Sequence, residues 1–190
     1  AFGGGAGYVP PHERMWNVID GRDPIAFLGL GDNIYHDAPG LPERQKFCYY
    51  RRQSRPEYRG FAAGSAIYAI WDDHDFGDND CWGGPEIDEP AWKPPVWRVF
   101  RENFVNPYYG GGKDQPGCWF DFRIGDVHFI MLDGRYYRTT PHQPNPSMLG
   151  PVQLQWLFDT LKASTGTFKV ICSPVPMVSG TKGDSHDTWD

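Results

Sequence analysis

Ser65-Ala-Ile-Tyr-Ala-Ile-Trp71 is a short apolar run, and Asp72-Asp-His-Asp-Phe-Gly-Asp-Asn-Asp80 follows it without a break. An apolar run of this length that stops at polar residues is typical of a buried strand that ends in a loop. Residues 23–31 (DPIAFLGLG) repeat the pattern, and Asp32-Asn-Ile-Tyr35 follow them. Because functional side chains gather at the ends of strands, we expect these two polar segments to form one site at neighbouring strand ends.

Helices and strands are expected to alternate along the chain. Further strands are expected at residues 119–123, 127–133 and 168–172, with a Gly125-Asp126 turn joining the first two as a hairpin. Helices are expected at residues 11–19, 41–63, 96–104 and 151–163, the second interrupted at Pro56, and residues 83–95 are expected to be an irregular loop. This alternation predicts an α/β fold, and 190 residues suffice for one domain with one core.

The composition excludes several classes of protein. With 39% hydrophobic and 22% charged residues the chain is typical of a soluble globular protein, and no apolar run approaches the roughly 20 residues that span a bilayer. A formal net charge of −6 argues against a nucleic acid as a stable partner. The four cysteines form no C-x-x-C pair, so neither a zinc knuckle nor a redox motif is indicated, while disulfides and the oligomeric state stay open.

The acidic segment after Trp71 points to metal binding. Like charges at this density destabilise a fold unless cations or firm hydrogen bonds offset them. Carboxylate oxygens with an imidazole suit a pair of divalent or trivalent cations, and a carboxylate that bridges two ions is a standard device of metallophosphatases. The alternative is a solvated turn, since Gly-Asp-Asn is a common turn sequence. An EF-hand loop that starts at Asp73 fails, because its sixth position is Asp78 rather than glycine.

Six segments together resemble one family. They are GDNIY (31–35), WDDHDF (71–76), LDGRYYR (132–138), LGPVQLQWL (149–157), FKVICSPVPM (168–177) and DTWD (187–190). In this combination and order the chain resembles the PhoD-like alkaline phosphatases, a branch of the calcineurin-like metallophosphoesterase superfamily. The resemblance implies a layered β-sheet sandwich flanked by helices, formed by a partial PhoD-like metallophosphatase domain at residues 1–190 that is incomplete at both ends.

The resemblance also implies roles for four residues. Asp32 looks like the carboxylate that bridges two metal ions, and Tyr35 like the phenolate ligand of an iron-type site. Asp73 stands where related enzymes have an asparagine or aspartate ligand, and His74 stands at the place of the catalytic histidine beside the scissile phosphate. The implied cofactors are two metal ions, iron with calcium or other divalent cations.

Five further residues are expected around these ligands. Arg135 and Arg138 have two readings, because a guanidinium suits phosphate oxygens but also pairs with nearby carboxylates. They are therefore either substrate-binding residues or structural ion-pair partners. Asp72, Asp75 and Asn33 are expected to orient the ligand loops through hydrogen bonds.

Two ligand segments of the family are expected outside the chain. One is a strand that would end just before Ala1, and the other is a Gly-Asp-X-His motif that would follow Asp190. Gly125-Asp-Val-His128 matches that motif in its residue types. However, the alternation of apolar and polar residues that starts at Val127 predicts that His128 is an ordinary strand residue.

These expectations favour a metal-dependent phosphoester hydrolase that uses a metal-activated water molecule on a small phosphoester. Two alternatives stay open, a related metallohydrolase with another ester or anhydride substrate, and a catalytically inactive partial scaffold. The resemblance implies a periplasmic or extracellular location. The chain starts with Ala1 and shows no apolar leader, so we expect that a leader has been removed or that the sequence starts inside a longer protein.

Overall fold

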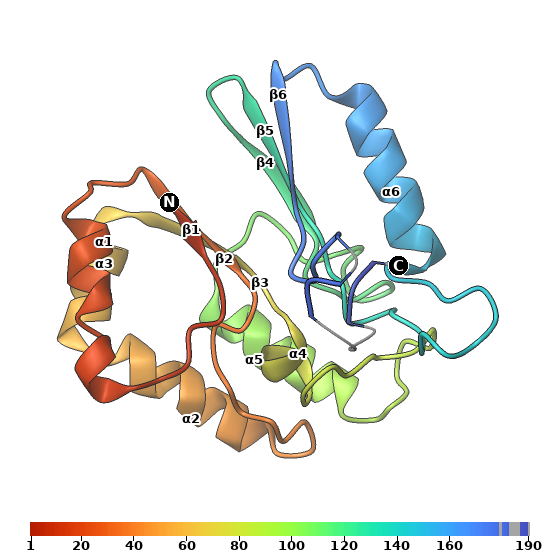
Figure 1. Ribbon diagram of the computed structural model, residues 1–190, viewed down its shortest axis with the longest axis horizontal. Helices are drawn as coiled ribbons and strands as arrows, with labels where there is room; N and C mark the ends of the chain where they lie inside the picture. Colours follow the sequence, from red (N-terminus) through yellow and green to blue (C-terminus); the bar gives the residue numbers. More distant parts are fainter. Residues whose placement is uncertain (179, 183–186, 190) are drawn as a thin grey trace.

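Two small β-sheets stand side by side in the molecule (Figure 1). The structure, a computed structural model, describes residues 1–178, 180–182 and 187–189. The first sheet is parallel, in the order β1 (Phe2–Gly3), β2 (Ala26–Leu30) and β3 (Ala66–Ile70). The second sheet contains β4 (Phe120–Ile124), β5 (Val127–Met131) and β6 (Phe168–Cys172), with β4 antiparallel and β6 parallel to β5. The predicted α/β class and layered sheets are confirmed.

The register of the first sheet brings two strand ends to one level. Leu30, the last residue of β2, pairs with Ile70, the last residue of β3. Because the strands are parallel, the residues that follow them leave the sheet at the same edge. Asp32 and Asp72 each come two residues after their strand, so the expected neighbouring strand ends are confirmed.

Helices cover the outer sides of the sheets. The 3₁₀ helix η1 (Pro10–His12) leads into α1 (Met15–Asp20), and α2 (Pro42–Gln53) and α3 (Pro56–Gly64) follow β2. In Figure 1, α1, α2 and α3 lie on the side of the first sheet that faces away from the second, and α6 (Gly150–Ala163) lies beside β6. Pro56 ends one helix and begins the next, as its missing N–H predicts.

Three local features differ from the sequence predictions. The four-residue helix α4 (Asp73–Phe76) forms where only a polar loop was expected. Helix α5 (Lys93–Asn103) begins inside the segment expected to be irregular, because Pro94 and Pro95 fit its first turn, where no N–H is needed. The strand β1 was not expected either, since two residues are too few to show alternation.

An aromatic core fixes the end of β3. Trp71 is fully buried, and its ring lies 5.0 Å from Phe76 and 4.9 Å from Phe100 between centroids. Its indole N–H donates a 2.8 Å hydrogen bond to Asp133 at the end of β5. Tyr68 packs at the margin of this core, stacked on Phe122. Trp71 therefore fixes the start of the acidic turn to both sheets, through its packing and through its hydrogen bond to Asp133.

The remaining global expectations concern cysteines and membranes. All four cysteines are free in the structure. Within the described residues, none of the helices has the length and apolar character needed to cross a bilayer.

On α6, the expected apolar face is only partly covered, since Leu157 is buried while Leu154 and Phe158 are about half exposed.

Candidate active site

Asp32, Asp73 and His74 converge at the ends of β2 and β3. One ligand atom from each side chain lies within 4.8 Å of the others. Gly31 permits this approach, since a Cβ there would stand 2.5 Å from the Cβ of Asp72, and its φ of 105° suits only glycine. The structure therefore brings together two of the predicted metal ligands and the predicted catalytic histidine.

A capping box stabilises the N-terminus of the short helix α4, which forms at the start of the acidic segment. Asp72 is the N-cap and its side chain accepts the N–H of Asp75, while the Asp75 carboxylate accepts the N–H of Asp72 at 3.1 Å. This reciprocal pair turns the chain directly after β3. It places Asp73 and His74 in the first helical turn, facing the loop that follows β2.

Asp75 also joins this turn to the loop after β2. Its carboxylate accepts hydrogen bonds from the backbone N–H of Asn33 at 3.0 Å and of Ile34 at 3.2 Å, and from the Tyr49 hydroxyl at 3.0 Å. Burial, together with the charge of Asp32, raises the pKa of Asp75 to about 8, while these hydrogen bonds act in the opposite direction. Asp75 and Asn33 thus make the contacts expected of supporting residues.

Two carboxylate oxygens in the site lack a hydrogen bond. Oδ1 of Asp32 and Oδ1 of Asp73 are buried, and neither has a hydrogen-bond partner among the described residues. Burial, together with the charges of Asp72 and Asp73, raises the pKa of Asp32 to about 6. A cation between these oxygens would relieve both the missing contacts and the repulsion, so the residues fit a metal ion.

Tyr35 lies beside the same carboxylate. Its hydroxyl donates a 3.0 Å hydrogen bond to Oδ2 of Asp32. Burial and the charge of Asp32 hold the pKa of the phenol above its usual range, so the proton stays on Tyr35 unless a cation takes its place. The position suits the predicted phenolate ligand.

His74 is held by Asp37, a residue that the sequence did not single out. Nδ1 of His74 is hydrogen bonded to the carboxylate of Asp37, and the Tyr35 ring lies 4.2 Å from the imidazole between centroids. Although burial opposes it, the hydrogen bond to Asp37 and the charges of Asp73 and Asp32 raise the pKa of His74. The bond to Asp37 leaves Nε2 as the ring nitrogen for a substrate.

Arg135 pairs with carboxylates of the site, and its Nη2 lies 3.6 Å from Oδ1 of Asp73. The side chain is fully buried. Its Nε donates to Asp72 at 2.5 Å, and its terminal nitrogens donate to Asp187 at 2.8 and 2.9 Å and to the carbonyl of Cys81 at 3.1 Å. These contacts use all three nitrogens of the guanidinium as donors. They therefore favour a structural ion pair over substrate binding.

A second acidic group, formed by Asp73, Asp80 and Asp187, shares this network. Their carboxylates also lie within 4.8 Å of one another. Three cations approach the group, since Arg138 and Lys182 join Arg135 at Asp187. These cations hold the pKa of Asp187 well below its usual range despite its burial. We therefore interpret this group as an ion-pair network, which also gives Arg138 a structural role.

His128 is a strand residue of β5, as predicted. Its ring is hydrogen bonded to Asp121 at 2.8 Å and to Ser164 at 2.7 Å, which joins β4 to the end of α6. The Gly-Asp-X-His pattern that was expected to follow Asp190 also occurs inside the chain, at residues 183–186, so the expectation that this motif lies outside the chain was wrong. These residues lie outside the part of the chain that the structure describes, as does Asp190.

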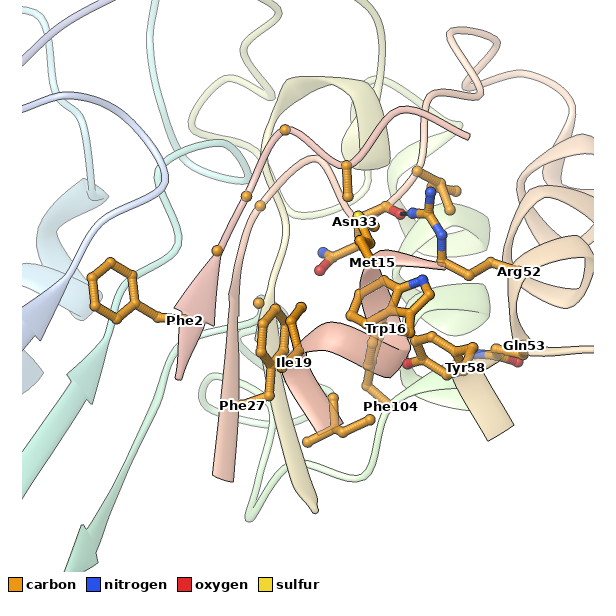
Figure 2. A pocket seen from close by; sticks show the side chains of 18 of the residues that line it. Phe2, Met15, Trp16, Ile19, Phe27, Asn33, Arg52, Gln53, Tyr58 and Phe104 are labelled. Carbon is orange, nitrogen blue, oxygen red and sulfur yellow. Dashed lines mark hydrogen bonds between the residues drawn. The ribbon is translucent and has the colours of Figure 1, made fainter. Parts of the chain in front are cut away.

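A cavity on the helix-covered side of the first sheet extends to Gly31 and Asn33, the residues on either side of Asp32 (Figure 2). It has a volume of about 210 Å³, and its walls are mostly apolar, including Trp16, Phe27 and Tyr58. Among the described residues, Arg52 is the one charged side chain in its wall, and it is paired with Glu13 at 2.9 Å. The cavity therefore lacks groups that would attack or protonate an ester.

Comparison with known proteins agrees with the geometry. The family model of PhoD-like phosphatases matches residues 1–190. A solved structure described as "Structure of PhoD" superposes on 90% of this chain with a TM-score of 0.75 and 18% sequence identity. The match covers 40% of that chain, so this chain spans less than half of its length. No curated protein matches with significance.

Proposed function

Since the chain belongs to the PhoD-like phosphatase family, we propose that it is a metal-dependent phosphoester hydrolase with its site at the ends of β2 and β3. The observation that carries the proposal is the convergence of Asp32, Asp73 and His74 within 4.8 Å. Oδ1 of Asp32, which is buried without a hydrogen-bond partner among the described residues, supports it independently.

The described residues can be assigned to distinct tasks. Asp32 lies between the other ligands and would bridge two cations, with Tyr35 on one side and Asp73 on the other. Bound there, a cation pair such as iron with calcium would acidify a water molecule and neutralise phosphate oxygens. His74 would donate a proton from Nε2 to the departing alkoxide, and Asp37 would hold the ring in position through Nδ1.

The proposed substrate is a small phosphoester, either a monoester or a diester. The site lies at a sheet edge and its histidine is partly exposed, so an exposed phosphate group can reach it. By analogy with its family we propose an exported protein that acts in the periplasm or outside the cell.

Substitution of Asp32 tests the proposal. Asp32→Asn should lower the metal content, measured by elemental analysis after equilibration with Mn²⁺, and abolish hydrolysis of p-nitrophenyl phosphate and bis-p-nitrophenyl phosphate. Asp23→Asn is the matched control, because Asp23 has a similar left-handed φ of 50° against 47° for Asp32 but is exposed. If Asp32→Asn kept both its metal and its activity, the bridging role would be refuted. Stoichiometric metal without hydrolysis in the unmodified protein would favour an inactive scaffold.

A further inference from the structure

The third strand of the first sheet also ends at the site. Strand β1 runs parallel to β2, and Gly3 pairs with Gly29. The chain that leaves β1 therefore emerges at the edge where Asp32 and Asp73 lie. The segment formed by residues 2–7 reads Phe-Gly-Gly-Gly-Ala-Gly and has no side chain with a metal-ligating atom.

Backbone hydrogen bonds hold this segment against the loop after β2. The N–H of Gly5 donates to the carbonyl of Gly31 at 3.3 Å, and the N–H of Ala6 donates to the carbonyl of Asp32 at 2.9 Å. The segment thus forms one wall of the site. The strand beside β2 ends at Gly3, so the wall begins with the residues directly after it.

Gly5 leaves a space next to the phenol oxygen of Tyr35. A Cβ on Gly5 would lie 3.8 Å from that oxygen and would meet no other atom within 4 Å. The same oxygen is 3.0 Å from Oδ2 of Asp32. By contrast, a Cβ on Gly4 would lie only 3.1 Å from the carbonyl oxygen of Gly31. Gly5 is therefore the position in this segment from which a side chain would reach the group formed by Tyr35 and Asp32.

We infer that the proposed metal site at Asp32 and Tyr35 has an open coordination position on its β1 side. There Gly5 leaves room for water or a phosphate oxygen in place of a protein ligand. The inference rests on the proposed function, because it concerns the cation held by Asp32 and Tyr35. Among the described residues, no side chain reaches that cation from the β1 side, and the affinity of such sites rises with the number of charged ligands, so an added carboxylate there should tighten binding.

Three substitutions test the inference, with Mn²⁺ binding measured by isothermal titration calorimetry. Gly5→Asp adds a carboxylate at the open position, and Asp tolerates the left-handed φ of 66° at this residue. Gly5→Asn has the same shape and backbone tolerance without the charge. Gly7→Asp adds the same charge nearby, but a Cβ on Gly7 faces ring carbon Cε2 of Tyr35 at 3.9 Å rather than its oxygen.

Gly5→Asp is expected to tighten the weaker Mn²⁺ site by about tenfold or more, while Gly5→Asn and Gly7→Asp leave it nearly unchanged. Thermal unfolding without metal should show that all three variants fold. If Gly5→Asp bound Mn²⁺ no more tightly than Gly5→Asn, or if Gly7→Asp had an equal effect, the open position would be refuted while the proposed function stood. If the unmodified chain bound no Mn²⁺, the open position and the proposed function would both be refuted.

Discussion

The carboxylate of Asp75 accepts a 3.0 Å hydrogen bond from the backbone N–H of Asn33, although the two residues are 42 positions apart in the chain. This bond fixes the loop after β2 to the turn after β3. Because Asp32 precedes Asn33 and Asp73 lies in the same short helix as Asp75, the bond also sets the distance between the two proposed metal ligands. The proposed site therefore depends on a fully buried residue that is not itself one of the proposed metal ligands.

Asp75→Asn should destabilise the protein by about 1–3 kcal/mol, the usual cost of leaving buried hydrogen-bonding groups unsatisfied. The Asn amide would turn an NH₂ group toward N–H or O–H donors, since both Asp75 oxygens accept hydrogen bonds. The free energy of unfolding in urea measures the effect. Asp114→Asn is the control, because Asp114 is an exposed residue. Equal stability of the two variants would contradict the proposed role of Asp75.

Arg135→Gln should lower the free energy of unfolding by about 3–5 kcal/mol, because it leaves the buried Asp72 without its cation and removes one of the three cations at Asp187. Arg123→Gln, on the exposed part of β4, should change stability by less than about 0.5 kcal/mol. Thermal or urea unfolding measures both changes in the free energy of unfolding. If Arg135→Gln folded normally and lost only affinity for phosphate, Arg135 would be a substrate-binding residue after all.

Local patterns were enough to predict the strands that carry the site. The apolar runs before Gly31 and before Asp72 predicted β2 and β3, because buried parallel strands need continuous apolar sequence. The polar residues directly after them indicated Asp32, Asp73 and His74. Strand order and register then follow from the parallel pairing of consecutive strands, which is common in α/β folds.

Long-range partners were not predictable in the same way. Arg135 was left with two readings, since only the folded chain shows that Asp187 and Asp72 surround it. Asp37 was missed because one carboxylate in a loop gives no sequence pattern, and its role arises from contact with a histidine 37 positions later. Gly5 was missed because an open space next to Tyr35 depends on packing rather than on local sequence.

Lys93→Met should change how stability depends on pH above neutrality. Lys93 is fully buried, and its Nζ donates to the carbonyls of Gly83 and Gly84 at 3.2 and 3.3 Å and lies 4.2 Å from the centre of the Tyr136 ring. Burial lowers the pKa of Lys93 to about 8. The unfolded chain, with an ordinary lysine pKa near 10.5, then binds more protons between about pH 8 and 10.5.

Lys93 by itself therefore makes the free energy of unfolding rise with pH across that window. The difference in unfolding free energy between the unmodified protein and Lys93→Met, measured in urea from pH 7 to pH 10.5, should shift in favour of the unmodified protein as the pH increases. Lys162→Met removes an exposed lysine of α6 and should show no such trend. A flat difference for Lys93→Met would mean that the buried ammonium keeps its ordinary pKa.

Asp37→Asn should lower turnover without removing the metal. Asp37 is hydrogen bonded to Nδ1 of His74 and is too exposed to contribute much to stability, so its loss should mainly leave the imidazole without its orienting partner. We expect turnover to fall about tenfold to hundredfold, and by about 10²–10⁴-fold in His74→Gln, which removes the proton donor itself. Metal content, measured by elemental analysis, should match that of Asp23→Asn in both variants. Parallel loss of metal and turnover in Asp37→Asn would instead place Asp37 among the metal ligands.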